Sequence, residues 1–110
     1  MFRRFFANLR GKLSLPEALK ESDLLVVDVR SVEEVKQLGD AYPKSVNIPV
    51  DALHNNMKLL GEDKTRPILF YCAKGIRAGN AAKFVSQFGY KNVYSTDNSQ
   101  SLKSIVEQNR

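Results

Sequence analysis

Apolar residues along this chain form short continuous runs separated by stretches with helical spacing. Leu24–Val29 is a continuous apolar run broken only by Asp28. Runs of this kind are typical of strands that are covered on both faces. Val46–Ile48, Ile68–Tyr71 and Val93–Tyr94 predict three further short strands.

The segments between these strands have sequence features that are typical of helices. Ser14 and Ser31 each begin a Ser-x-x-Glu capping box, and Gly39 is placed to end the second helix. We expect the first helix to run to about Glu21. Apolar spacing predicts three more helices, carried by Leu53, Met57 and Leu60, by Ala78, Ala81, Ala82, Val85 and Phe88, and by Leu102, Ile105 and Val106. Alternating strands and helices predict an α/β fold with a central, mostly parallel sheet and helices on both faces.

The first 13 residues form a segment of different character. Phe2, Phe5, Phe6 and Leu9 have the spacing of one helix face, and arginines lie between them. We therefore divide the chain into a basic amphipathic segment, residues 1–13, and one domain, residues 14–110. The segment could contact a membrane surface, act as a mitochondrial targeting element or pack on the domain, and its sequence leaves these alternatives open.

Composition narrows the function classes. The chain has 110 residues, one cysteine and one histidine, which excludes an intrachain disulfide and argues against a structural zinc site or other cofactor. The net charge is +5, but residues 1–13 carry four of these charges, so we expect no nucleic-acid partner. The chain lacks both a membrane-spanning run of about 18 apolar residues and a secretory signal, and we expect a cytoplasmic location.

The single cysteine, Cys72, lies where the strand Ile68–Tyr71 gives way to a helix. At such a junction, unpaired backbone N–H groups and the positive end of the helix dipole stabilise a thiolate. Lys74 and Arg77 add positive charge, and Gly75 allows a tight turn with its amides directed inward. We therefore expect a nucleophilic thiolate that is open to solvent, with loop amides that bind an oxyanion. The alternative is a buried cysteine that packs as a small apolar residue.

Four segments in order resemble one known family. Cys72-Ala-Lys-Gly-Ile-Arg77 followed by Ala78 resembles the C-x-x-G-x-R-[SA] active-site loop of rhodanese-like sulfurtransferases. The other three are Leu24–Arg30 with Glu33 or Glu34, Asn47-Ile-Pro49, and Gly89-Tyr-Lys-Asn-Val-Tyr94. The resemblance covers roughly residues 14–107 and implies a rhodanese-like fold.

The resemblance implies a ping-pong sulfur transfer. The catalytic Cys72 would take a sulfur atom from thiosulfate or a similar donor and pass it, from a persulfide, to cyanide or a thiol. The substrate-binding loop would comprise Ala73, Lys74, Gly75, Ile76 and Arg77. In the family, a basic residue at the position of Lys74 is associated with thiosulfate. Arg77 would either contact the donor or brace the loop.

Two other functions remain open. The domain could be a sulfur carrier or an interaction module for a partner protein. It could also be a small cysteine phosphatase or arsenate reductase, although those relatives use a C-x5-R loop and only four residues separate Cys72 from Arg77 here. The chain departs from the family at Gly39–Ser45, which lacks a His and is one residue longer, and at Ser95–Gln100, where a Gly-Gly turn is common. These departures leave the rim of the pocket undetermined.

Four other residues have a structural and a functional interpretation. Asp28 and Arg30 lie near the predicted pocket, and we expect Arg30 to pair with Glu33 or Glu34 and fix the turn after the strand. His54 is expected to be exposed, with a distant acid–base role as its alternative. Tyr71 is expected to point into a helix layer, with a place in the pocket wall as its alternative.

Overall fold

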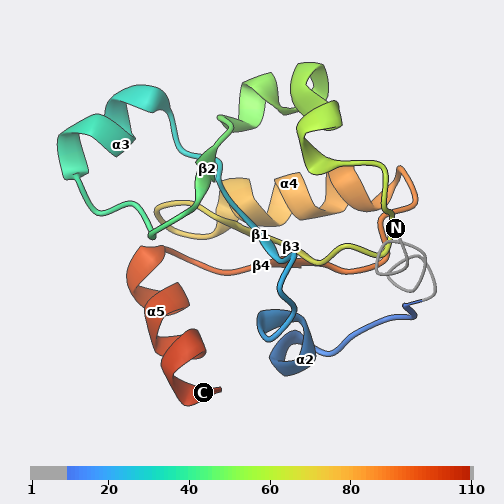
Figure 1. Cartoon of the computed structure of the whole chain (residues 1–110). Helices are drawn as coiled ribbons and strands as arrows, with labels where there is room; N and C mark the ends of the chain where they lie inside the picture. Colours follow the sequence, from blue (N-terminus) through green and yellow to red (C-terminus); the bar gives the residue numbers. More distant parts are fainter. Residues whose placement is uncertain (1–9, 110) are drawn as a thin grey trace.

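Four strands form one parallel sheet in the computed structural model, which describes residues 10–109 (Figure 1). The strands are β1 (Leu25–Asp28), β2 (Val46–Asn47), β3 (Ile68–Tyr71) and β4 (Val93–Ser95), and their order in the sheet is β2-β1-β3-β4. Every neighbouring pair among them is parallel. The predicted α/β fold with a parallel sheet is therefore confirmed.

Helices cover both faces of the sheet, as predicted. The helical segments are α2 (Leu15–Leu19), α3 (Val32–Leu38), η1 (Val50–Leu60), α4 (Ile76–Ser86) and α5 (Ser99–Gln108). In Figure 1, η1 and α4 lie on one side of the sheet, and α2 and α5 lie on the other.

Local signals fix several helix ends. Both capping boxes form, with the Ser14 and Ser31 hydroxyls accepting hydrogen bonds from the backbone N–H groups of Glu17 and Glu34. Gly39 ends α3 in the left-handed conformation, at φ 62°, which costs glycine little. These ends need no distant contact, which explains why the sequence predicts them well.

The helices differ from expectation in three places. α2 ends at Leu19 rather than near Glu21. The predicted third helix is a 3₁₀ segment, η1, with a kink at Asn56, where φ is −124°. α4 ends at Ser86, so Phe88 falls beyond the buried helix face and is 49% exposed.

The core has two layers because side chains alternate across β3. Ile68, Phe70 and Cys72 pack in the layer beneath η1 and α4, together with Val27 and Val29 of the β1 segment. The intervening Leu69 and Tyr71 pack in the other layer, against residues such as Leu102 of α5. The sheet therefore assigns Cys72 to the face that α4 covers.

Residues 10–13 are attached to the domain. Arg10 makes ion pairs of 2.7–3.0 Å with Glu21, Asp23 and Asp63, at the edge of the sheet where the strands begin. Asn92 donates to the Gly11 carbonyl and accepts from the Leu13 N–H. Residues 1–9, which carry the apolar face predicted for the amphipathic segment, lie outside the described residues. None of the described helices has the length and apolarity to cross a membrane.

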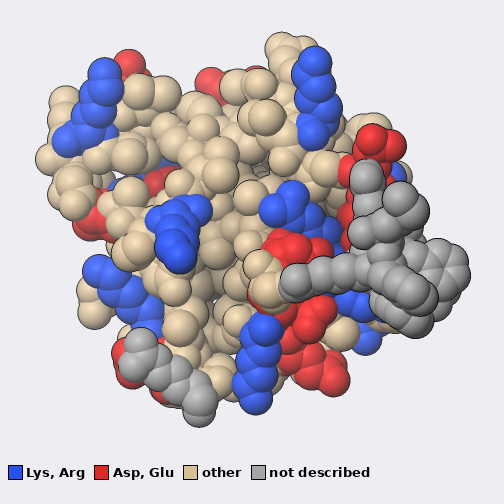
Figure 2. All heavy atoms as spheres, viewed as in Figure 1, with Lys and Arg blue, Asp and Glu red and all other residues tan. Residues whose placement is uncertain are grey.

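The positive charge on the face seen in Figure 2 is dispersed. Lys and Arg side chains are spread singly over it, and acidic side chains lie among them. This face therefore presents no continuous basic patch of the kind that binds a nucleic-acid backbone.

Candidate active site

Cys72 lies directly after the carboxyl end of β3, at the edge of the sheet where ligands bind in folds of this class. The Gly75 N–H donates to Cys72 Sγ at 3.0 Å, and the Ala78 N–H donates at 3.4 Å. Gly75 adopts φ 95° immediately before α4, which turns the loop back over the sulfur. The Gly75 donor belongs to the predicted loop and the Ala78 donor follows it in α4, and donors of this kind stabilise a thiolate.

The expectation of a sulfur open to solvent is wrong in this structure. Cys72 is only 1% exposed and belongs to the apolar layer beneath α4. The reason is the alternation of β3, which directs residue 72 to the same face as Phe70. The sulfur is thus held by amides on one side and by apolar packing on the other.

Arg77 braces the loop. Its guanidinium donates two hydrogen bonds to the Glu34 carboxylate, at 2.6 and 3.0 Å, and so ties α4 to α3. The hydrogen bonds to Glu34 raise the pKa of Arg77. Of the two roles predicted for Arg77, the structure shows the bracing contact.

The other predicted substrate-binding residues form the rest of the loop. Lys74 and Ile76 are exposed, and Ile76 is 74% exposed although it is apolar. Ala73 and Gly75 are half-buried. The loop therefore presents one cation and one apolar side chain to solvent beside a covered sulfur.

The segment after β4 packs directly on this loop, which the sequence did not reveal. The Asp97 carbonyl accepts a hydrogen bond from the Cys72 N–H at 2.9 Å, and Asn98 Nδ2 donates to the Ala73 carbonyl at 3.4 Å. A Cβ added at Gly75 would lie 2.7 Å from Asp97 Oδ1. The only sequence signal was the absence of the family's Gly-Gly turn at this position.

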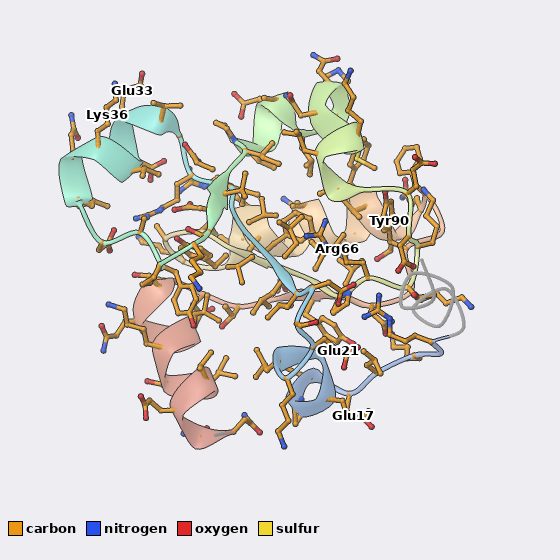
Figure 3. All side chains as sticks on the ribbon, in the orientation of Figure 1. Glu17, Glu21, Glu33, Lys36, Arg66 and Tyr90 are labelled. Carbon is orange, nitrogen blue, oxygen red and sulfur yellow. The ribbon has the colours of Figure 1, made fainter. Side chains whose placement is uncertain are left out.

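Arg30 does not pair with Glu33 or Glu34, contrary to expectation. Its guanidinium bonds the Asp28 carboxylate at 2.8–3.1 Å and Asp40 at 2.8 Å. The side chains of Arg30 and Asp28 are 3% and 1% exposed. β1 ends with both residues turned inward, whereas Glu34 is engaged by Arg77. Figure 3 shows Glu33 on α3 pointing away from the sheet.

Tyr71 and His54 lie as expected. Tyr71 is buried in the layer that packs against α5, and its hydroxyl accepts from the Tyr42 N–H at 2.8 Å. His54 is exposed and lines a pocket of about 340 Å³ between η1 and α4, together with Asn80 and Phe84. The lining of this pocket does not include Cys72. Within residues 10–109, no cluster of three metal-ligating side chains is present.

Residues 13–101 match the rhodanese-like domain family. The chain belongs to this family. Its relatives include the thiosulfate sulfurtransferase GlpE of Coxiella burnetii, which is 32% identical over 84 residues, covering 72% of this chain and 70% of that protein. The resemblance predicted from four sequence segments is therefore confirmed.

Some other relatives of this chain have a different named activity and are much longer. A tRNA uridine(34) hydroxylase of Hamiltonella defensa is 32% identical over 82 residues, but the match covers 71% of this chain and only 22% of the hydroxylase. The structure of a rhodanese with anions from Escherichia coli superposes with a TM-score of 0.60 at 23% identity, covering 70% of this chain and 88% of that one. That likeness supports the fold alone.

Proposed function

We propose that this rhodanese-like domain is a sulfurtransferase that carries a sulfane sulfur on Cys72. The observation that supports this most directly is the pair of backbone amides that donate to Cys72 Sγ from the turn into α4. The match to the family over residues 13–101 and the likeness to a thiosulfate sulfurtransferase support the same activity.

In the proposed first step, the Cys72 thiolate attacks the outer sulfur of thiosulfate. A new S–S bond forms, the S–S bond of thiosulfate breaks, and sulfite leaves with the bonding electrons. The loop amides around Gly75 stabilise the resulting anionic persulfide. In the second step, cyanide or a thiolate takes the outer sulfur and restores the Cys72 thiolate, so no external oxidant or metal is required.

The burial of Cys72 adds a condition to this proposal. Because the residue is 1% exposed, atoms of the covering loop must move before a donor reaches the sulfur. The segment around Asp97 contacts the same loop through the Cys72 N–H and must accommodate this movement. The single cysteine also suits a reducing, cytoplasmic compartment, in which thiol acceptors are abundant.

The test combines activity with intact mass. Wild type and Cys72→Ser are incubated with thiosulfate, weighed by mass spectrometry, and then assayed for thiocyanate after cyanide is added. Wild type should gain the mass of one sulfur atom and lose it to cyanide, whereas Cys72→Ser should do neither. A variant with substantial residual turnover would remove Cys72 as the nucleophile, and rapid hydrolysis of p-nitrophenyl phosphate by wild type would favour the phosphatase alternative.

Exposure of Ile76 favours a second candidate, delivery of sulfur to a partner protein. An apolar side chain that is 74% exposed beside the reactive cysteine is suited to contact with a protein surface. Ile76→Ser should then slow transfer from the persulfide to a thiol-bearing protein while transfer to cyanide is unchanged. Leu59→Ser provides the control, because Leu59 is 53% exposed on η1, outside the loop.

A further inference from the structure

Charge at the rim of the candidate site differs from the sequence expectation. Lys74 and Arg77 predict a surplus of two positive charges beside Cys72. In the structure, Glu34 neutralises Arg77 through a bidentate ion pair. Asp97 then adds a carboxylate against Gly75, the residue whose N–H holds the sulfur. Counted formally, the charges of Lys74 and Arg77 are balanced by those of Glu34 and Asp97, instead of leaving the surplus that the sequence predicts.

The position of Asp97 is fixed by the backbone on both sides. The Thr96 N–H donates to the Phe70 carbonyl at 3.0 Å, and the Asp97 carbonyl accepts from the Cys72 N–H at 2.9 Å. Asn98 caps α5 through its bond to the Ser101 N–H. These bonds hold the backbone of the segment in register beside the loop, so the Asp97 side chain can leave Gly75 only by changing its rotamer.

Among the described residues, no partner side chain binds the Asp97 carboxylate. Within the described part of the chain, it makes neither an ion pair nor a side-chain hydrogen bond, and the residue is exposed. It lies against the turn at Gly75, where an added Cβ would be 2.7 Å from Asp97 Oδ1. A carboxylate so placed repels any anion that approaches the loop, and the repulsion grows with the charge of that anion.

We propose that Asp97 is a specificity-determining residue that disfavours dianionic sulfur donors and favours donors with at most one negative charge, such as the persulfide of a thiol. This inference rests on the proposed function. With a persulfide donor, the Cys72 thiolate attacks the outer sulfur, the donor S–S bond breaks, and the departing thiolate accepts the proton that the transferred sulfur releases. The products are the Cys72 persulfide and a free thiol.

Two sulfur donors isolate the effect of charge. Thiosulfate is a dianion, and methanethiosulfonate is a monoanion in which a methyl group replaces one oxygen; both transfer a sulfur and release a sulfur oxyanion. The rate of Cys72 persulfide formation is measured by intact mass, without cyanide, for wild type and Asp97→Asn. At low salt, Asp97→Asn should raise the rate about fivefold with thiosulfate and about twofold with methanethiosulfonate. Added salt should shrink this difference, because the repulsion is screened.

Two control variants separate the effect of removing the Asp97 charge from the effects of side-chain shape and of removing an acidic side chain elsewhere. Asp97→Ser should change the donor preference in the same direction as Asp97→Asn, because both remove the charge. Glu62→Gln should leave both rates unchanged, because Glu62 is an exposed carboxylate between η1 and β3, at the opposite edge of the sheet.

The role of Asp97 would be overturned if its substitution changed the rate of persulfide formation equally with both donors. It would also be overturned if Asp97→Asn and Asp97→Ser kept the wild-type preference between the two donors. Either result would leave the sulfurtransferase proposal intact. If wild type forms no persulfide with either donor, the proposed function itself fails.

Discussion

Arg77 and Glu34 are joined by two hydrogen bonds of 2.6 and 3.0 Å, which link the start of α4 to the first turn of α3. Both side chains are about one-third exposed. The contact therefore fixes the far end of the Cys72 loop from outside the core.

This pair predicts a pH dependence of stability. The Arg77 guanidinium, followed by the Ser31 N–H, lowers the pKa of Glu34 from 4.5 to about 2. The folded state therefore gains stability above pH 4.5 and loses it as the pH falls towards about 2. Because the pair is partly exposed, we expect a contribution of only about 0.5–1 kcal/mol.

The measurement compares urea unfolding of wild type and Glu34→Gln from pH 6 to pH 2. The stability gap between them should be largest near neutral pH and should close in acid. Glu33→Gln is the control, since Glu33 is the neighbouring acid on α3 and points away from the sheet (Figure 3). A gap that persists at pH 2 would show that the effect of Glu34 does not depend on its charge.

Gly75→Ala should disrupt the loop. The residue has φ 95°, and its new Cβ would lie 2.7 Å from Asp97 Oδ1. We expect a loss of about 1–3 kcal/mol from the backbone strain, with slower persulfide formation. Gly79→Ala is the matched control within α4: its Cβ would have no neighbour within 4 Å, and it should stabilise the protein by about 0.5–1 kcal/mol.

A double variant separates the two causes. Gly75→Ala combined with Asp97→Gly removes the side-chain clash but keeps the left-handed backbone. Unfolding measurements should show partial recovery. If the double variant regained all of the lost stability, the whole effect would come from the clash with Asp97. If it regained none, the effect would come from the backbone strain at residue 75.

Arg30→Met should be strongly destabilising. It leaves the Asp28 carboxylate, whose side chain is 1% exposed, without its guanidinium partner. Loss of one partner of a buried ion pair costs about 3–5 kcal/mol. Asp40→Asn removes only the partner that is 49% exposed and should cost less than about 1 kcal/mol in the same unfolding experiment. Similar costs for the two variants would contradict the assignment of Asp28 as the main partner.

Covalent labelling tests the burial of Cys72. With the residue 1% exposed, a neutral alkylating reagent such as iodoacetamide should react far more slowly with the native protein than with the urea-unfolded chain. Mass spectrometry gives both rates. Gly75→Ala should accelerate native labelling by loosening the loop, and equal rates for native and unfolded wild type would show that the sulfur is accessible.

Sequence reasoning succeeded where neighbouring residues decide the structure. The capping boxes at Ser14 and Ser31 and the left-handed Gly39 depend on contacts within a few residues. The position of Cys72 between β3 and α4 follows from an apolar run that meets a helical pattern. Such signals located the candidate site.

It failed where distant segments meet. Arg30 reaches Asp40 because the chain after α3 returns beside β1, which local spacing does not reveal, whereas its other partner, Asp28, is only two residues away. Asp97 reaches the Cys72 loop because the segment after β4 runs alongside the end of β3. The burial of Cys72 depends on which face α4 covers, and a single sequence does not determine that.

The anchoring of Arg10 has a practical consequence. It pairs with Glu21, Asp23 and Asp63 at the edge where β1 and β3 begin, whereas Cys72 follows their other ends. A protein tethered to a bead or sensor chip through a linker ahead of residue 10 would therefore turn the edge that holds Cys72 outward. Sulfur exchange with soluble macromolecules could then be followed on the immobilised domain without the support blocking approach.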